Sequence, residues 1–480
     1  MRGLNTILKK VFIMSCISLS KVSFHYSGAD DLFSNISAVF HDNQIVAIIG
    51  DNGCGKTTLL NLIAGNLEPT AGTITRGARV YLMPQMSAYD SKSGGEHQQK
   101  ILATAFASGA DILLLDEPTN NLDGAAKEKL FNDIFSFNGG LVLISHDREL
   151  LSRVNTIFEL KKDNLKLYNG NYDFYLSQKQ AEQRQLEAKL NNTENRIARL
   201  NKTKTIALDC AATGQKKLNQ TRQKALQCGN HKALSGIHDA SDKLENIMVK
   251  KLKLIQKKLD EKAQERQQIS ESLRDDKIKI PLPQKPFLKN ELLRIENMSF
   301  GYDNLIFDGF DFSMRGGERV RLMGKNGCGK TTLLKLILGR LRPQSGEIKL
   351  FGRASYLDQN LSLLYSNQTI VDNIMNLTDL NLNQSFAIAA NFGFKNEQAR
   401  KKVGVLSGGE LLKATLCVVL GSDNQPDLLI LDEPTNNLDL KSIAILEDAL
   451  NQYRGAILLV SHDEMFVRNI KIDQEIEIKS

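Results

Sequence analysis

Two kinds of hydrophobic pattern alternate along the chain. Mainly apolar runs at residues 45–49 and 319–323 end before a glycine, and runs at 112–115 and 428–431 end before an aspartate. Runs of this kind predict strands buried inside a sheet. A glycine-rich loop and a further apolar stretch follow the runs at 45–49 and 319–323, which predicts the order strand, loop, helix in each case.

The middle of the chain has a different pattern. Over residues 177–204 and 241–273, Leu, Ile and Val recur at helical spacing among charged residues. Gly214, Gly229 and Gly236 fall between these stretches, and we expect them to interrupt the helical pattern. The sequence therefore predicts an antiparallel helical hairpin with a broken tip.

The two outer parts of the chain are copies of one another. GDNGCGKTTLLNLI, beginning at Gly50, recurs as GKNGCGKTTLLKLI, beginning at Gly324. DEPTNNLD occurs in both copies, and LVLISHD recurs as ILLVSHD. The expected boundaries are 14–176 for the first copy, 177–286 for the helical linker and 287–480 for the second copy.

Positive charge is concentrated in the linker. The chain carries a net charge of +7, whereas residues 177–280 alone hold 23 basic and 13 acidic side chains, a net charge of +10. Such a segment favours a polyanionic partner, because each neutralised phosphate releases counterions; a solvated linker whose charges only keep it soluble is the alternative. The basic residues around the predicted tip are Arg196, Arg199, Lys202, Lys204, Lys216, Lys217, Arg222, Lys224 and Lys232.

The remaining composition restricts the setting of the protein. No stretch approaches the roughly 20 apolar residues that span a bilayer. The basic, apolar N-terminus lacks the cleavage pattern of a signal peptide, and Met14 is a possible alternative start. Cys54 and Cys328 lie inside the glycine-rich loops, where a disulfide would distort the loop, so we expect a reducing, cytoplasmic setting.

Both copies carry the pattern G-x-x-x-x-G-K-[ST] between a predicted strand and a predicted helix. The glycines let successive N–H groups point at phosphate oxygens, and the helix N-terminus adds its dipole. Lys56 and Lys330 are expected to reach the β- and γ-phosphates of a nucleotide. The predicted contacts in the two loops are Gly50, Asn52, Gly53, Gly55, Lys56, Thr57 and Thr58 in the first copy, and Gly324, Asn326, Gly327, Gly329, Lys330, Thr331 and Thr332 in the second.

Acidic residues and a histidine follow the other apolar strands of each copy. An aspartate placed this way can bind Mg²⁺ together with the loop threonine, the next glutamate can polarise an attacking water, and the histidine can sense a γ-phosphate. In strand order these are Asp116, Glu117 and His146 in the first copy, and Asp432, Glu433 and His462 in the second, with Thr57 and Thr331 as the loop ligands of the metal.

The combined pattern resembles the ATP-binding cassette (ABC) ATPases. The resemblance implies an α/β fold with two P-loop ABC nucleotide-binding domains, a Mg²⁺-dependent ATPase activity, and cassettes that close head-to-tail over two ATP molecules. It identifies SGGE as the signature motif, at Ser93–Glu96 and, with the preceding leucine, at Leu406–Glu410. It also matches Gln85 and Gln359 to the metal-binding Q-loop, and Tyr26 and Tyr302 to the aromatic residue that stacks on adenine.

Each expected ATP site then combines residues of both copies. One site pairs Lys56, Asp116, Glu117 and His146 with Ser407, Gly408 and Gly409, and the other pairs Lys330, Asp432, Glu433 and His462 with Ser93, Gly94 and Gly95.

Tandem cassettes separated by a basic helical linker resemble the ABC-F branch, whose members bind the ribosome. The resemblance implies contact of the linker with rRNA or tRNA and an intramolecular closure of a monomer. Asn121 and Asn437 stand where the branch commonly has histidine. An energy subunit of an ABC transporter, and a DNA-directed ABC ATPase, are the alternative readings.

The first copy is shorter than the second. Seven residues separate Gln85 from Ser93, against 47 between Gln359 and Ser407, so we expect the helical subdomain of the first cassette to be almost absent. A first cassette of this kind resembles ABC-F antibiotic-resistance proteins. Because that subdomain orients the signature helix, we hypothesise that the site using Ser93 hydrolyses ATP more slowly.

Overall fold

The structure is a computed structural model that describes residues 15–83, 94–120, 122–227, 231–274, 282–283, 290–325, 327–422, 424–436 and 438–478. The chain forms two compact units. Residues 176–278 form one, and the two cassettes together form the other.

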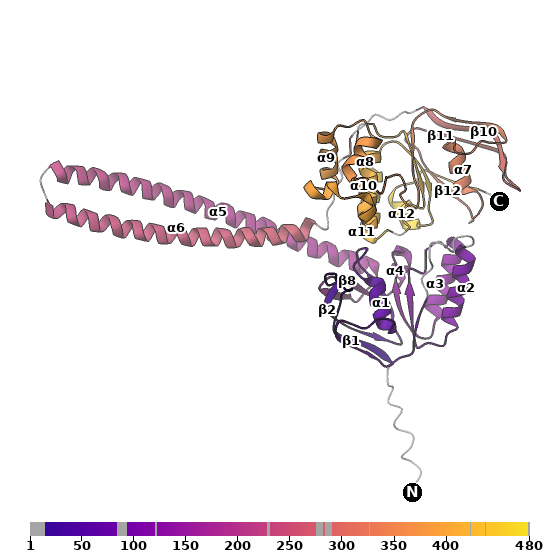
Figure 1. Ribbon diagram of the computed structural model, residues 1–480, viewed down its shortest axis with the longest axis horizontal. Coiled ribbons are helices and arrows are strands. Elements are labelled where there is room, and N and C mark those ends of the chain that lie inside the picture. The colour runs from indigo at the N-terminus through magenta and orange to yellow at the C-terminus, as the bar shows by residue number, and fades with distance from the viewer. Residues whose placement is uncertain are drawn as a thin grey trace, which may run out of the picture. The chain divides into compact units, whose positions relative to one another are not determined.

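The first cassette is built on a largely parallel sheet (Figure 1). Its strand order is β5-β6-β7-β3-β8-β9, and only the β8–β9 pair is antiparallel. The central strands β3 (Ile45–Ile49), β6 (Ile112–Asp116) and β7 (Gly140–Ile144) are almost wholly buried, as their continuous apolar sequences require. The outer strands are β5 (Val80–Leu82), β8 (Thr156–Lys161) and β9 (Asn164–Tyr168), and the helices are α1 (Lys56–Ala64), α2 (Gly94–Phe106), α3 (Gly124–Ser136) and α4 (Arg148–Arg153).

A small antiparallel sheet completes the first cassette. Its order is β2-β1-β4, formed by Phe33–His41, Cys16–Phe24 and Ala71–Arg76. Its apolar face packs with β3 and α1 in one core cluster that includes Phe33 and Phe40, both fully buried.

The second cassette repeats this plan. A five-stranded parallel sheet has the order β14-β15-β16-β12-β17, and a three-stranded antiparallel sheet has the order β11-β10-β13. The strands are β10 (Glu291–Gly301), β11 (Leu305–Arg315), β12 (Arg319–Met323), β13 (Ser345–Leu350), β14 (Ala354–Leu357), β15 (Leu428–Asp432), β16 (Ala456–Val460) and β17 (Gln474–Glu477). The helices that follow the strands of the parallel sheet are α7 (Lys330–Ile337), α10 (Gly408–Leu420), α11 (Leu440–Gln452) and α12 (Glu464–Asn469).

The two cassettes differ most between the outer strand and the signature helix. In the second cassette, α8 (Ile370–Leu377), α9 (Leu382–Asn391) and two 3-10 turns (Asn396–Arg400 and Val403–Val405) lie between β14 and α10. In the first cassette only 11 residues lie between Leu82 and Gly94, and ten of them, 84–93, are outside the described residues. This connection has no room for the two helices and the 3-10 turns of the second copy.

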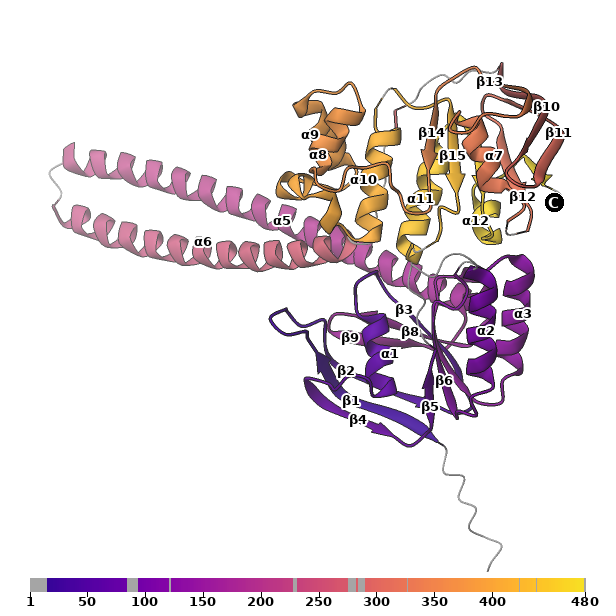
Figure 2. The same cartoon turned by 45° about the vertical axis from the view of Figure 1, so that its right-hand side comes forward.

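The linker is an antiparallel pair of long helices, α5 (Tyr172–Gln227) and α6 (His231–Arg274) (Figure 2). Lys204 Nζ donates to Gln256 Oε1 at 2.8 Å, and Arg266 Nε donates to Glu194 Oε1 at 2.8 Å. Glu194 lies ten residues before Lys204 on α5, and Arg266 lies ten residues after Gln256 on α6. Both hydrogen bonds therefore fit one antiparallel register of the two helices. Among the described helices, none has an apolar stretch long enough to cross a membrane.

The expected interruption of the linker helices at Gly214 and Gly236 is wrong. Gly214 lies inside α5 and Gly236 inside α6, while Gly229 lies outside the described residues. A glycine inside a helix costs only about 1 kcal/mol relative to alanine, which flanking helix-forming residues can offset. The basic residues that the prediction placed in the broken tip before Lys232 therefore belong to α5, namely Lys216, Lys217, Arg222 and Lys224.

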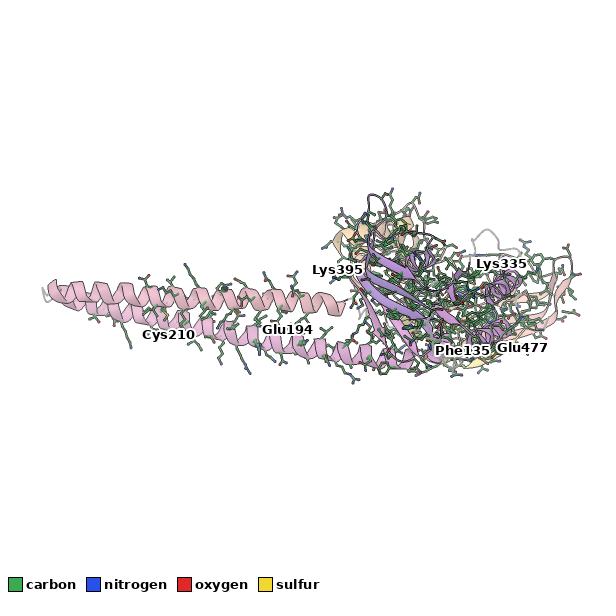
Figure 3. All side chains as sticks on the ribbon, turned by 90° about the horizontal axis from the view of Figure 1, so that it is seen from below. Phe135, Glu194, Cys210, Lys335, Lys395 and Glu477 are labelled. Atoms are coloured by element: carbon green, nitrogen blue, oxygen red, sulfur yellow. The ribbon has the colours of Figure 1, made fainter. Side chains whose placement is uncertain are left out.

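Two helices alone can bury only a narrow stripe. Ala207, Ile255 and Leu259 are buried along the hairpin, whereas Ile206 and Leu254 are exposed. Figure 3 shows side chains projecting along both helices, with Glu194 and Cys210 labelled.

Candidate nucleotide site

The phosphate loop of the first cassette joins β3 to α1. Gly53 and Gly55 have φ values of 80° and 96°, in the left-handed region that favours glycine. A Cβ atom at Gly55 would lie 2.6 Å from Leu32 Cδ2. Lys56, the first residue of α1, donates from Nζ to the carbonyl oxygens of Gly50 at 2.8 Å and Asp51 at 3.1 Å. The lysine therefore lies over the curled loop, where its charge suits a bound phosphate.

The second cassette has the same loop between β12 and α7. Gly327 and Gly329 have φ values of 83° and 101°. Lys330 Nζ donates to the carbonyl oxygens of Gly324 at 2.6 Å and Lys325 at 2.9 Å. The predicted contact Asn326 lies outside the described residues.

The loop threonines meet the strand aspartates, as the metal prediction expects of neighbouring ligands. Thr57 Oγ1 donates to Asp116 Oδ2 at 2.7 Å, and Thr331 Oγ1 donates to Asp432 Oδ2 at 3.0 Å. Burial raises the pKa of Asp116. Hydroxyl and carboxylate oxygens suit Mg²⁺, so this pair of atoms fits the expected metal in each cassette. Gln359 of the second cassette lines a cavity together with Thr57 and Asp116 of the first, while Gln85 lies outside the described residues.

Tyr356 adds a contact that only the second site has. Its hydroxyl donates to Asp432 Oδ2 at 3.1 Å. The register of β14 against β15 and of β5 against β6 places Leu82 at the corresponding position of the first cassette.

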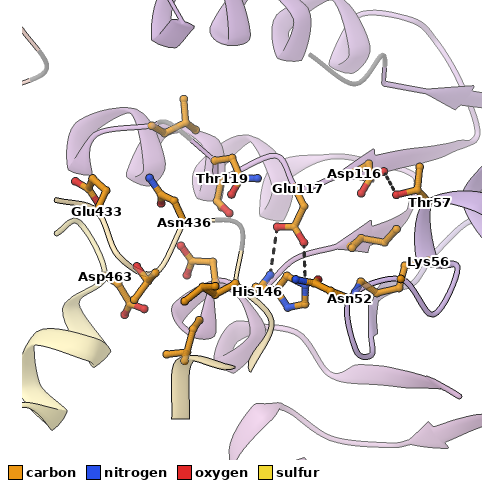
Figure 4. Close-up of a pocket in the computed structure, with 18 of the residues that line it drawn as sticks. Asn52, Lys56, Thr57, Asp116, Glu117, Thr119, His146, Glu433, Asn436 and Asp463 are labelled. Atoms are coloured by element: carbon orange, nitrogen blue, oxygen red, sulfur yellow. Dashed lines mark hydrogen bonds and ion pairs between the residues drawn. The ribbon is translucent and has the colours of Figure 1, made fainter. Parts of the chain in front are cut away.

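The glutamate of each cassette lies beside its histidine at the carboxyl end of neighbouring strands, and Figure 4 shows the pair of the first cassette, Glu117 and His146. Glu117 Oε1 lies 3.4 Å from His146 Nε2 without forming a hydrogen bond, and Glu117 Oε2 accepts one from the His146 backbone N–H at 3.4 Å. Burial, with the neighbouring charge of Asp116, raises the pKa of Glu117 to about 8. Burial lowers the pKa of His146 to about 3, so the two side chains do not form an ion pair at neutral pH.

Glu433 and His462 repeat this geometry. Glu433 Oε1 lies 3.5 Å from His462 Nε2, and Glu433 Oε2 accepts a hydrogen bond from the His462 backbone N–H at 3.3 Å. Burial raises the pKa of Glu433 to about 7 and lowers that of His462 to about 4. Glu117 and Glu433 both have a φ of 48°, unusual for a residue with a side chain. Both glutamates can accept a proton from water once they are ionised.

One cavity of about 600 Å³ is lined by both cassettes. Its lining includes the first phosphate loop with Glu117 and His146, and also Glu433 and His462 of the second cassette (Figure 4). Two further contacts join the cassettes: Asp439 Oδ2 accepts a hydrogen bond from the Asn52 backbone N–H at 2.9 Å, and Lys441 pairs with Asp51 at 3.0 Å. Both glutamates therefore open onto one shared space.

A buried ionic cluster also joins the cassettes. Arg148 donates from Nη2 to Glu447 Oε1 at 2.6 Å and to Asp463 Oδ2 at 3.3 Å, and all three side chains are at least 84% buried. The matching position after the second His-Asp pair holds Glu464, which pairs with Arg321 inside its own cassette. The first cassette therefore contributes an arginine to the contact between the cassettes, and the second has a glutamate at the matching position.

The expected adenine-stacking residues are exposed at the end of equivalent strands. Tyr26 packs edge-on against Phe24, and Tyr302 packs edge-on against Phe300. Tyr26 lines the shared cavity, and its hydroxyl lies 3.1 Å from Thr58 Oγ1. Thr332 is half-buried near the start of α7.

The signature residues of the second cassette form a helix N-terminus. The Ser407 side chain accepts from the Glu410 backbone N–H, and the Glu410 carboxylate accepts from the Ser407 backbone, which is a capping box that S-x-x-E encodes. Among the described residues, Ser407, Gly408 and Gly409 are not part of the cavity lining. In the first cassette Gly94 and Gly95 begin α2, and Ser93 lies outside the described residues.

Sequence reasoning did not single out Lys127, Arg148 or Tyr356. An alignment of the two copies offers a signal for each, because Lys127 matches Ile443, Arg148 matches Glu464 and Tyr356 matches Leu82. Positions at which the two copies differ in charge or polarity mark where two related sites differ.

Comparisons with known proteins agree with this architecture. A family model described as "ABC transporter" matches residues 33–92 and 307–436, and a second with the same description matches 158–230. The ribosome protection protein VmlR of Bacillus subtilis is 30% identical over 94% of this chain and 84% of its own length. The erythromycin resistance ATP-binding protein MsrA of Staphylococcus epidermidis is 31% identical over 88% of this chain and 90% of its own length.

A solved structure shares the fold. It is a chain from the crystal structure of the complex of an archaeal ribosomal stalk protein and the archaeal ribosome recycling factor, with a TM-score of 0.58 at 16% identity. The match covers 95% of this chain and 87% of the other.

Proposed function

The chain belongs to the ABC-F family of tandem ATP-binding cassette ATPases, and we propose that it uses ATP binding and hydrolysis to engage and release the ribosome. The basic hairpin between the cassettes is the observation that carries this proposal. The working parts are residues 14–176, 177–286 and 287–480, acting as a cytoplasmic monomer.

ATP occupies two sites in this proposal. Lys56 and Lys330 would hold its phosphates. The residues that would hold Mg²⁺ are Thr57, Asp116 and Gln85 in the first cassette and Thr331, Asp432 and Gln359 in the second. The metal would supply positive charge to the phosphate oxygens. Closure brings Ser407–Gly409 to the first phosphate loop and Ser93–Gly95 to the second. Glu117 and Glu433 then position and deprotonate water, while His146 and His462 respond to the γ-phosphate.

The hairpin supplies the ribosome contact. One stretch of α5 carries Arg196, Arg199, Lys202 and Lys204. The first three side chains are exposed and Lys204 is half-buried. Exposed apolar residues such as Ile206 and Leu254 accompany them. Phosphate groups attract the charges, and bases or protein surfaces can cover the apolar side chains.

Two relatives narrow the proposal toward drug resistance. One bears the name of a ribosome protection protein and the other of an erythromycin resistance protein, and both align over most of their length. The short connection before α2 in the first cassette agrees with that type. We propose that displacement of a ribosome-bound antibiotic is the outcome of binding.

Co-sedimentation tests the proposal. The double variant Glu117→Gln, Glu433→Gln, loaded with ATP, should pellet with ribosomes through a sucrose cushion. Changing Arg196, Arg199, Lys202 and Lys204 to glutamate in that background should leave it in the supernatant. Pelleting only with membranes would favour a transporter subunit, and retention only on DNA would favour a DNA-directed ATPase.

A further inference from the structure

Lys127 is a charged residue of the first cassette that reaches the second. It lies on α3, one turn after the helix cap Asp123, and its side chain is only 16% exposed. Its Nζ donates to Asp147 Oδ2 at 2.9 Å and lies 3.4 Å from the His462 carbonyl oxygen of the other cassette. The lysine therefore bridges two backbone segments that belong to different ATP sites.

Each end of this bridge adjoins a γ-phosphate-sensing histidine. Asp147 directly follows His146, and it is held in place because its other oxygen caps α4. At the opposite end, His462 itself accepts the bond through its backbone. The Lys127 ammonium group therefore connects the two histidine segments, beside the contact that Arg148 makes with Asp463 at 3.3 Å.

The bridge exists in one direction only. Four residues after the cap Asp439 of the second cassette, Ile443 takes the position of Lys127. Ile443 also lines the shared cavity, but it has no charge or donor with which to reach the His146 segment. The first cassette therefore contributes a contact to the second site that it does not receive in return.

We propose that Lys127 is a positioning residue through which the first cassette sets the His462 segment of the second ATP site, so that turnover at that site depends on Lys127 and turnover at the first does not. The inference rests on the proposed ATPase function. The charge of Lys127 acts in the same place. Burial raises the pKa of Glu433 and the charge of Lys127 opposes that rise, whereas burial lowers the pKa of His462 and the charge of Lys127 adds to that fall.

Site-specific hydrolysis tests the inference. In the Glu117→Gln background only the second site turns over, and Lys127→Met should lower its kcat about tenfold, the effect of losing one charge-assisted hydrogen bond, with KM little changed. In the Glu433→Gln background, Lys127→Met should leave kcat within about twofold. Lys127→Arg should restore most of the lost activity, because arginine keeps the charge and the donors.

Lys129→Met is the matched control, since Lys129 is an exposed lysine on the same helix. It should change neither site. An equal loss at both sites after Lys127→Met, or no loss at the second, would overturn the inference while the parent remained an active ATPase. A parent chain without ATPase activity would instead refute the proposed function, and this inference with it.

Discussion

Arg148 offers a quantitative test of the contact between the cassettes. Its side chain is 7% exposed, and its guanidinium bridges the carboxylates of Glu447 and Asp463, whose side chains are 12% and 16% exposed. Replacing it with methionine keeps most of the side-chain volume but leaves two carboxylates without their cation. Removing one partner of a buried ion pair typically costs about 3–5 kcal/mol.

The remaining contacts place the expected loss near the lower end of that range. Glu447 keeps the amide of Asn469, whose Nδ2 lies 3.1 Å from both carboxylate oxygens. Asp463 keeps the Phe466 backbone N–H that it caps at 2.9 Å. We therefore expect Arg148→Met to reduce the free energy of unfolding by about 3 kcal/mol.

Urea unfolding of the nucleotide-free chain measures this loss of unfolding free energy. A chain of several domains need not unfold in one step, so the value is taken from the first unfolding transition. Lys441→Met is the matched control, since its pair with Asp51 also joins the cassettes but both side chains are about half exposed. That change should cost less than about 1 kcal/mol. Equal losses in the two variants, or a loss below about 1 kcal/mol for Arg148→Met, would refute the reasoning.

Three further perturbations have defined outcomes. His146 and His462 stay neutral in the folded chain, because burial lowers their pKa values to about 3 and about 4, whereas the unfolded chain binds protons below about pH 6.5. The contribution of each histidine to the free energy of unfolding should therefore fall as the pH drops from about 6.5 toward 4, by up to about 1.4 kcal/mol per pH unit. Because the raised pKa values of Glu117 and Glu433 act in the opposite direction, the measurement is the difference between parent and asparagine variants in urea titrations, and the variants should lose less stability on acidification than the parent. Gly55→Ala should reduce the number of ATP molecules bound per chain in calorimetry from two to one, because the φ of Gly55 is 96° and Leu32 blocks the added methyl group. Gly109→Ala is the control: its φ is 67° with open space around it, and the variant should still bind two ATP molecules. Ile255→Asp should make the hairpin protease-sensitive without changing basal ATPase activity, because a buried unpaired carboxylate costs several kcal/mol; unchanged protease resistance would contradict the buried stripe.

Local sequence was sufficient to predict the loops and the residues at the strand ends. A buried apolar run followed by G-x-x-x-x-G-K-T has few other solutions, and parallel strands bring their carboxyl ends to one edge, so the meeting of Thr57 with Asp116 follows from the order of elements. The side-chain contacts between the two cassettes could not be predicted from local sequence. Arg148 and Glu447 are 299 residues apart, and no local pattern encodes such a pair.

The linker shows the same limit in another form. The low helix propensity of glycine predicts an interruption at Gly214, yet α5 continues through this residue. Pairing with α6, through contacts such as Lys204 with Gln256, acts on the whole helix and outweighs a local preference of about 1 kcal/mol. The roles assigned to the site residues and the domain boundaries remain predictions.

A cross-link from the hairpin tests the central claim most directly. Cys210 is an exposed, free cysteine on α5, close in sequence to the basic residues, and it can carry a photoactivatable cross-linker once Cys16, Cys54 and Cys228 are replaced by serine. In the Glu117→Gln, Glu433→Gln background, irradiation with ribosomes should join Cys210 to ribosomal RNA or tRNA when ATP is present and not when ADP replaces it. Cross-links that form equally with either nucleotide, or that reach no ribosomal component, would contradict an ATP-dependent ribosome contact through the hairpin.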